Sequence, residues 1–338
     1  MDFIRKNKFL FTMTPLYIGD GELGIGHVDN MFIRTKHSKE PYIPGTTLLG
    51  NYSHFVGQYN FTEQLGQNWK NKIFGSGSDD NNCKEKKKAL RINSAFIVWI
   101  PCVTIHGIKL VTTVQRFHKI IPEIDLPDFK DDELLTHTNN LAEEGEYYWL
   151  NLKNLRITAN RKKCEEYDKQ SKKIKLPKDF PEIDKLEQKL VFVSKSVFNY
   201  IINKNMEIRT SVSIDKITGA GKTGALFTYE LIPRWTLFSF EIMLSQVLLM
   251  EKEQRKKNSS TNKKLICEET TDSSQTSKTP TKPEQTPEVD LDLDQITCKV
   301  WEILDKAKAF FEFAGIGGMT TRGFGKCEII DHNSKDIL

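Results

Sequence analysis

The residues with the clearest chemical character lie near the end of the sequence, in the glycine-rich segment 315–325. This segment holds five glycines and one arginine, Arg322. Glycine lets backbone approach a ligand closely, successive exposed amides form an anion-binding concavity, and a guanidinium adds a planar pair of donors. The pattern fits either a loop that holds a nucleic-acid backbone or a turn that closes a sheet. The segment lacks the lysine and the spacing of a nucleotide P-loop, which argues against ATP or GTP.

Two further segments could meet a phosphate backbone. Pro44 and Gly45 precede Thr46 and Thr47, either of which could cap a helix that runs toward Tyr59. A helix start preceded by glycine is a natural phosphate seat. The long loop before it contains several polar and charged residues, namely Asp20, Glu22, His27, Asp29, Arg34 and Lys36. In this loop the segment 24–29 places an acid beside flexible backbone.

Composition limits the classes of protein. The 338 residues suffice for one large or two ordinary domains, and 38% apolar with 28% charged residues indicates a soluble chain with a core. No apolar run is long enough to cross a bilayer, and the N-terminus lacks a signal-peptide pattern. The net charge is only +4, so a nucleic-acid site must come from local clustering. Six scattered cysteines without a C-x-x-C pair indicate a reducing cytoplasm rather than zinc or disulfides.

The hydrophobic pattern predicts the elements that must position these segments. It predicts strands over 9–18, 90–98, 105–114, 190–193, 236–249 and 326–331, and helices over 48–59, 196–203 and 293–314. The region from Pro122 to Pro181 has no regular pattern. The order of the elements favours an α+β fold with a ferredoxin-like (RRM-like) βαββαβ core and large insertions. The first and last strands would then be neighbours, which brings the Asp29 loop, Thr46 and the Gly317 loop into one region.

Two segments stand apart from that core. Residues 207–215 and 225–233 alternate and flank a polar, glycine-rich tip, so a long β-hairpin is predicted over about 206–233. An isolated two-stranded ribbon is marginal in water, so this arm needs a partner surface. Residues 251–290 contain eight basic and eight acidic residues and little apolar content, which predicts a disordered low-complexity insertion. Residues 1–250 and 291–338 would then form one domain.

Several of these motifs resemble a known family. The RAMP superfamily of CRISPR-associated proteins is similar in the segments 19–29, 43–48 and 315–325. The repeated backbone subunit of the type III-B (Cmr) effector is similar in the segments 73–76, 100–101, 106–107, 213–219 and 224–233. The related type III-A (Csm) subunit shares the Asp29 loop. At the helix start the family pattern carries a lysine and then an arginine, and this chain has Leu49 and Asn51 to Ser53 there instead.

The resemblance implies a complex and an activity. Copies of the chain would stack along a CRISPR guide RNA, join other subunits of a type III effector, and cut complementary target RNA at regular intervals. The hairpin would act as a thumb that displaces a nucleotide, with Ile214, Asp215, Thr218 and Gly219 at its tip. The residues implied to contact RNA are Arg34, Lys36, Gly45, Thr46, Thr47, Gly317, Gly318, Thr321 and Arg322. No membrane partner is implied.

Asp29 aligns with the catalytic aspartate of the family, which acts with a divalent metal ion, expected to be Mg²⁺. RNA can be cut by its own 2′-hydroxyl once its backbone is kinked into line, and a carboxylate can take that proton or hold the metal. His27 could supply an acid, Asp20 and Glu22 could assist a metal, and Tyr229 and Glu230 could face a neighbouring copy. Each of these five also has an ordinary structural interpretation.

Two other functions stay open at this point. The chain could be a purely structural RNA-binding backbone subunit of the same kind of complex. It could also be a monomeric guide-processing ribonuclease with a histidine base, although the thumb-like hairpin and the absence of a clear histidine dyad argue against that.

Overall fold

The structure is a computed structural model that describes residues 3–21, 28–58, 73–74, 88–104, 107–141, 147–149, 156–172, 174, 176, 180, 183–215, 217–246, 248–249 and 293–331. His27, Glu22 and the predicted insertion 251–290 lie outside these residues. The chain divides into two compact units. The first contains Met1–Arg5, Leu49–Ile92 and Ile242–Ala307, and the second contains Lys6–Leu48, Asn93–Glu241 and Lys308–Leu338. The predicted boundaries of a single domain stay a prediction.

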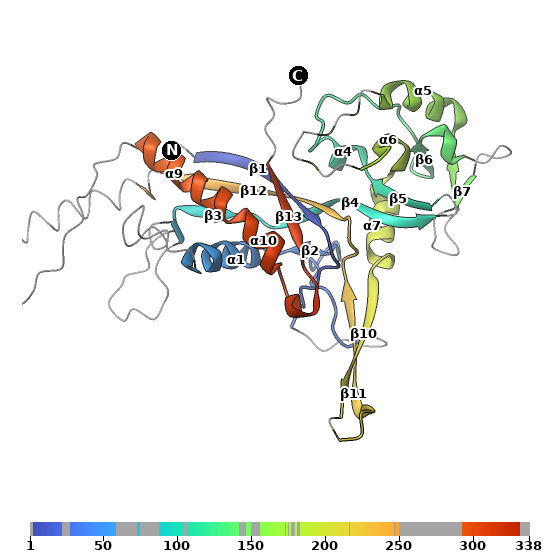
Figure 1. Cartoon of the computed structure of the whole chain (residues 1–338). Helices are drawn as coiled ribbons and strands as arrows, with labels where there is room; N and C mark the ends of the chain where they lie inside the picture. The colour runs from blue at the N-terminus through green and yellow to red at the C-terminus, as the bar shows by residue number, and fades with distance from the viewer. Residues whose placement is uncertain are drawn as a thin grey trace, which may run out of the picture. The chain divides into compact units, whose positions relative to one another are not determined.

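A large mixed sheet forms the frame of the second unit (Figure 1). Its strands lie in the order β13 (Cys327–Asp331), β1 (Phe3–Thr12), β12 (Leu237–Ser245), β4 (Ala95–Thr104), β5 (Gly107–Thr112), β9 (Leu190–Val193), β6 (Glu133–Thr136), β8 (Arg156–Ala159) and β7 (Tyr147–Trp149). The short β2 (Tyr42–Ile43) also pairs with β4. The α+β class is confirmed. The predicted pairing of the first and last strands is also confirmed, because β1 and β13 are antiparallel neighbours with Leu10 opposite Ile329.

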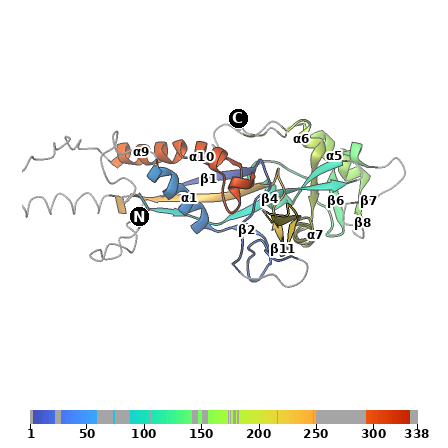
Figure 2. The same ribbon diagram turned by 60° about the horizontal axis from the view of Figure 1, so that its bottom comes forward.

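The burial of the central strands follows from their composition. Within β4 only Val103 is exposed, and β9 is a run of four buried apolar residues. Such unbroken apolar runs are typical of strands covered on both faces. The covering elements include α4 (Val114–Phe117), α5 (Arg161–Ser171), α6 (Leu186–Lys189), α7 (Lys195–Lys204) and α10 (Lys308–Ala314), and the short turns η1 (Thr138–Asn140) and η2 (Thr320–Arg322) complete this unit. Figure 2 shows α5 and α6 at the end of the sheet formed by β6, β7 and β8.

The first unit contains most of α1 (Gly45–Gln58), the strand β3 (Leu90–Ile92) and α9 (Leu293–Lys306). β3 pairs with the C-terminal half of β12, with Ile92 opposite Ile242. In α9 the buried residues Ile296, Val300 and Leu304 recur at helical spacing, so one face of the helix is apolar.

The predicted hairpin is confirmed. β10 (Glu207–Ile214) and β11 (Gly221–Leu231) form a separate antiparallel pair with a bulge after Val212. Figure 1 shows the two strands as a ribbon that extends away from the large sheet. Most of its side chains are exposed, including Leu226 at 61% and Ile217 at 95%. We call Glu207–Leu231 the thumb hairpin.

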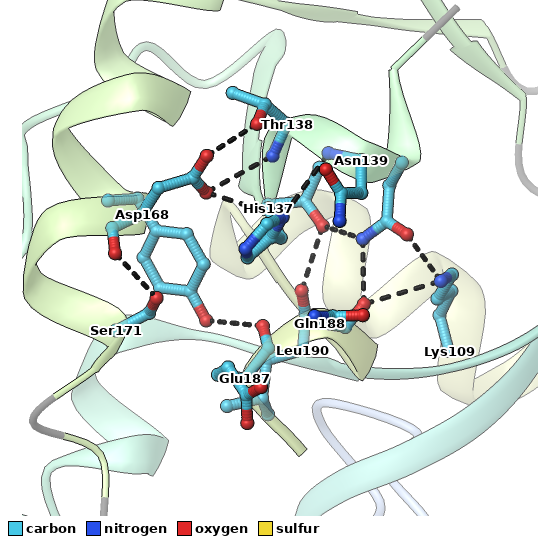
Figure 3. Close-up of polar contacts among 12 residues, drawn as sticks. Lys109, His137, Thr138, Asn139, Asp168, Ser171, Glu187, Gln188 and Leu190 are labelled. Carbon is cyan, nitrogen blue, oxygen red and sulfur yellow. Dashed lines mark hydrogen bonds and ion pairs between the residues drawn. The ribbon is translucent and has the colours of Figure 1, made fainter. Parts of the chain in front are cut away.

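A buried polar network ties together the strands at the β5–β7 end of the sheet (Figure 3). Lys109 of β5 donates to the side-chain oxygen of Asn140 and, at 3.3 Å, to the carbonyl of Gln188. Asn140 donates to Thr136 Oγ1 at 2.8 Å and to the same carbonyl at 2.7 Å. Burial, with a smaller effect of Lys189, lowers the pKa of Lys109. Because these acceptors are neutral protein groups, we interpret the network as structural.

The structure also corrects some expectations. The predicted helix over 293–314 is two helices, α9 and α10, which are separated at Ala307. The predicted strand over 90–98 is β3 and β4, separated at Asn93 and Ser94. The region predicted to be irregular, 122–181, contributes β6, β7, β8 and α5. Within the described ranges, no helix is both long and apolar enough to span a membrane.

Candidate functional site

Asp29 is held against the base of the thumb hairpin by Thr228. The Asp29 Oδ2 atom accepts hydrogen bonds from the Thr228 amide at 2.7 Å and from the Thr228 hydroxyl at 2.9 Å. In return the Asp29 amide donates to Thr228 Oγ1 at 2.9 Å. The next residue continues the pairing, because the Asn30 amide donates to the Thr228 carbonyl at 3.0 Å and the Glu230 amide donates to the Asn30 carbonyl at 3.0 Å. A loop residue is thereby bonded to a strand 199 positions later.

These bonds favour the ionised form of the carboxylate and leave one of its two oxygen atoms available to a ligand. The amide and hydroxyl of Thr228 lower the pKa of Asp29, because both bonds favour the ionised form. The side chain is exposed. Both hydrogen bonds from Thr228 are accepted by Oδ2, so Oδ1 keeps capacity for a ligand.

A second contact ties the same loop to the same strand. The Arg34 guanidinium forms a two-armed ion pair with Glu230, with Nη1 and Nη2 each 2.6 Å from a carboxylate oxygen. Arg34 also donates to Asn203 Oδ1 at 3.1 Å and to the Phe32 carbonyl at 2.9 Å. The pair is largely buried, at 13% and 9% side-chain exposure. The structure thus gives Arg34 a structural contact, and its role in RNA binding stays a prediction.

The glycine-rich segment packs against the chain that follows β1. Gly317 has φ +84°, and a Cβ there would lie 2.1 Å from the Tyr17 carbonyl oxygen. The Gly318 amide donates to that carbonyl at 2.9 Å, and the Gly325 amide donates to the Pro15 carbonyl at 2.8 Å. Close approach to the chain's own backbone therefore accounts for these glycines. Contacts of Gly317 and Gly318 with RNA stay predictions.

Aromatic and polar contacts connect this segment to the thumb hairpin. Tyr17 packs edge-on against Tyr229 of β11, with ring centroids 5.4 Å apart. Burial, with smaller effects of Tyr229 and Asp20, raises the pKa of Tyr17, so its hydroxyl stays protonated near neutral pH. Arg322 is exposed and donates to Ser211 Oγ of β10 at 3.3 Å. The Asp29 loop and the glycine segment thus both contact the base of the thumb hairpin.

At the start of the helix, the predicted cap is wrong. α1 begins at Gly45, so Thr46 and Thr47 lie in its first turn. The Gly45 amide donates to Ser94 Oγ at 3.2 Å, and the Thr47 amide donates to the Pro44 carbonyl at 3.0 Å. Thr46 is exposed. Gly45, Thr46 and Thr47 stay predicted RNA contacts.

The thumb tip is a hydrogen-bonded turn organised by Asp215. Its Oδ1 accepts from the amides of Ile217 at 2.8 Å and Thr218 at 3.0 Å, and its carbonyl accepts from the Gly219 amide at 2.9 Å. The two amides lower the pKa of Asp215. Gly219 has φ +68°, which suits glycine. Ile214, Asp215, Thr218 and Gly219 are therefore brought together, as the sequence predicted for the tip.

The remaining predicted residues are simply exposed: Lys36, Thr321 and Asp20. Among the described residues no three His, Cys, Asp or Glu side chains form a group that could hold a metal ion. Sequence reasoning missed Thr228 and Tyr17. Thr228 carried a weak signal, because it is a hydroxyl residue in the alternating strand of a hairpin already singled out; Tyr17 carried none.

Comparison with known proteins agrees with the resemblance in the sequence. The family model described as the RAMP superfamily matches residues 10–328. A curated relative from Pyrococcus furiosus, the CRISPR system Cmr endoribonuclease Cmr4, is 23% identical over 253 residues, which cover 70% of this chain and 80% of that protein.

Solved structures share the fold along nearly the whole chain. A chain in the cryo-EM structure of the type III-B Cmr-beta complex bound to cognate target RNA has a TM-score of 0.55 at 17% identity and covers 99% of each chain. Oligomeric Cmr4 from Pyrococcus furiosus has a TM-score of 0.55 at 15% identity and covers 97% of this chain and 99% of that one.

Proposed function

We propose a function from one premise, which is that this chain belongs to the RAMP superfamily. In this proposal the chain is the repeated guide-binding backbone subunit of a type III CRISPR effector complex. Copies assemble along a CRISPR guide RNA with other subunits, and each copy cleaves the bound target RNA with Asp29 as the catalytic residue. The observation that carries the proposal is the Asp29 carboxylate, held ionised and exposed at the base of the thumb hairpin.

The core of this subunit, which we call the palm, is ferredoxin-like. Its four strands are β13, β1, β12 and β4, adjacent in that order. Support comes from the connections: β1 leads to β4 through α1, and β12 leads to β13 through α9 and α10. Each inner strand is thus followed by a helix and then by an outer strand, as a βαββαβ core requires. We also propose a cytoplasmic location, because the six cysteines are scattered without a pattern of disulfide pairs, as is usual in a reducing compartment.

The state of Asp29 favours one of its two chemical roles. A carboxylate whose pKa is lowered is a weak base near neutral pH, so it is poorly suited to take the 2′-hydroxyl proton. An ionised carboxylate with Oδ1 open is suited to hold a cation at the scissile phosphate. The contribution of Asp29 is therefore a fixed negative charge at the base of the thumb hairpin.

A single carboxylate fits the way Mg²⁺ is usually bound. Mg²⁺ keeps several waters and is held by one or two carboxylates together with substrate phosphates. The described residues offer Asp29 Oδ1 and no cage of three acids or histidines, which suits such a site. When bound there, the ion would stabilise charge on the scissile phosphate. The residues of this chain would orient the carboxylate and keep it ionised.

The test is Asp29→Asn in the complex assembled with guide RNA. The variant keeps the shape of the side chain and removes its charge. We expect assembly on guide RNA to be unchanged and cleavage of complementary target to fall about a hundred- to a thousandfold, the scale of losing one group that stabilises the transition state. Asp125→Asn, the same change at an exposed loop acid, is the matched control.

The outcomes separate the competing functions. Cleavage by Asp29→Asn at the wild-type rate would contradict the catalytic role and favour a purely structural backbone subunit. Metal-independent cutting of repeat RNA by the isolated chain would instead indicate a guide-processing ribonuclease.

A further inference from the structure

We propose that Thr228 is the positioning residue for Asp29, and that through it the thumb hairpin sets the orientation of the catalytic carboxylate. The inference rests on the proposed function and deepens it. Three hydrogen bonds carry it: two donated by Thr228 to Asp29 Oδ2, at 2.7 and 2.9 Å, and one donated by the Asp29 amide to Thr228 Oγ1, at 2.9 Å. Side chain and backbone of both residues take part, so rotation of either side chain breaks at least one bond.

The Asp29 side chain is ordered by hydrogen bonds rather than by packing. The side chain is exposed, so packing does not fix its rotamer. Along the same segment, the Asn30 amide donates to the Thr228 carbonyl and the Phe32 amide donates to Glu230 Oε2 at 3.1 Å. Arg34 pairs with Glu230 as well, and the Ile33 amide donates to the Ile18 carbonyl at 2.9 Å. Thr228 and Glu230, two positions apart on β11, thus hold most of the segment 29–34, so a shift of β11 would be transmitted to it.

The charges around Asp29 do not compete with Thr228. On β11 the carboxylate of Glu230 is paired with Arg34. On β10 the residue opposite Thr228 is Thr210, which is uncharged. Arg209 of β10, one position before Thr210, is paired with Glu207. No described residue forms an ion pair with Asp29, so hydrogen bonds from Thr228 are the main influence on its ionisation.

A mechanical consequence follows from the location of Thr228. The thumb hairpin is a two-stranded ribbon with exposed apolar side chains, such as Leu226 and Ile217. A surface of this kind is stabilised when RNA or a second copy covers it. Because Thr228 lies on the same strand as Leu226, binding of the hairpin to its partner would also fix the orientation of the Asp29 carboxylate. Cleavage would then depend on correct binding of the hairpin.

The variant that tests this is Thr228→Val. Valine keeps the branched shape and the strand preference of threonine and removes only the hydroxyl. Thr228→Ser restores a hydroxyl and is the rescue variant. Thr210→Val makes the same change on the neighbouring strand, at the position paired with Thr228, and is the matched control.

The first readout is the carboxyl carbon shift of Asp29 near neutral pH, measured by carbon NMR of the full chain labelled at aspartate carboxyls and assigned with Asp29→Asn. This shift reports the hydrogen bonds that the carboxylate accepts, one of which comes from the Thr228 hydroxyl. We expect the shift to move in Thr228→Val, to return toward the wild-type value in Thr228→Ser and to stay unchanged in Thr210→Val.

The second readout is target binding and single-turnover target cleavage by guide-loaded complexes near neutral pH. We expect Thr228→Val to cut about tenfold more slowly, the usual loss when a positioning contact is removed. Target binding should stay unchanged, because the variant alters the orientation of the carboxylate and not its charge. Thr228→Ser recovers most of the rate, and Thr210→Val cuts like the wild type.

Support requires the carboxyl shift and the cleavage rate both to change in Thr228→Val and to recover in Thr228→Ser. An Asp29 carboxyl shift like that of the wild type in Thr228→Val, or an unimpaired cleavage rate, overturns the positioning role. The two proposals fail separately. If Asp29→Asn cuts like the wild type, the proposed function fails; if Asp29→Asn is inactive and Thr228→Val is unimpaired, only the positioning role fails.

Discussion

At the scale of single residues, two atoms of the Asp29 carboxylate have different environments. Oδ2 accepts both hydrogen bonds from Thr228, and no other described residue donates to Oδ1. One oxygen therefore fixes the group and the other remains for a ligand. The glycines show a comparable division: Gly317 has φ +84° with the Tyr17 carbonyl in the way of any Cβ, whereas Gly323 has φ +86° with nothing within 4 Å.

This pair of glycines gives a residue-scale prediction. Gly323→Ala should lower the free energy of unfolding only by the strain of a left-handed backbone, about 1 kcal/mol. Gly317→Ala adds to that strain a displacement of backbone, because its Cβ would lie 2.1 Å from the Tyr17 carbonyl oxygen. We expect a total of about 3 kcal/mol or more. Urea unfolding of the two variants beside the wild type measures the difference, and equal losses would contradict close packing at Gly317.

At the scale of elements, the thumb hairpin is held at its base and exposed at its tip. Strand β11 bonds to the segment 29–34 through Thr228 and Glu230, and β10 bonds to the glycine segment through Ser211. Beyond these contacts the hairpin is a two-stranded ribbon, which is marginal alone. The base contacts therefore determine where the tip points.

The Arg34–Glu230 pair can be tested against a second arginine–glutamate pair in the same hairpin. Glu230→Gln leaves a largely buried guanidinium without its counter-charge, so we expect a loss of about 3 kcal/mol. Glu207→Gln removes the partner of Arg209, whose side chain is 58% exposed, and we expect less than about 1 kcal/mol. Chemical unfolding measures both losses, and hydrogen exchange should rise in β10 and β11 for Glu230→Gln alone. Similar effects of the two variants would show that burial does not strengthen this contact.

At the scale of the whole molecule, assembly on guide RNA should depend on the exposed apolar side chains of the thumb hairpin. Ile217 is 95% exposed and Leu226 is 61% exposed, and neither contributes to the core. Exposed apolar side chains gathered on one projecting element are typical of a surface that a partner covers. In the proposed complex that partner is RNA or the next copy.

We expect the double variant Ile217→Ser with Leu226→Ser to unfold within about 0.5 kcal/mol of the wild type, because both side chains are exposed. Its assembly on guide RNA, followed by light scattering, should require about tenfold more protein. Val103→Ser, at a side chain 51% exposed in β4, is the control and should assemble normally. Unchanged assembly by the double variant would contradict a role of this surface in the complex.

The sequence alone determined the local elements and the family. Alternation predicted β10 and β11, helical spacing predicted the apolar face of α9, and ordered motifs predicted the RAMP superfamily, because each of these signals is local or additive along the chain. Alternation carried no signal for the strands within 122–181, which are short or covered by other elements, so the sequence missed them.

Only the tertiary structure decided what each predicted residue touches. It brought Asp29 into hydrogen-bond contact with Thr228 and Arg34 into an ion pair with Glu230, and it placed the Tyr17 carbonyl against Gly317. These partners lie up to about three hundred positions apart in the sequence, and pairs at such separations are set by how strands and loops pack rather than by any local pattern. The chemistry of Asp29 therefore depends on a strand that its own segment of sequence does not reveal.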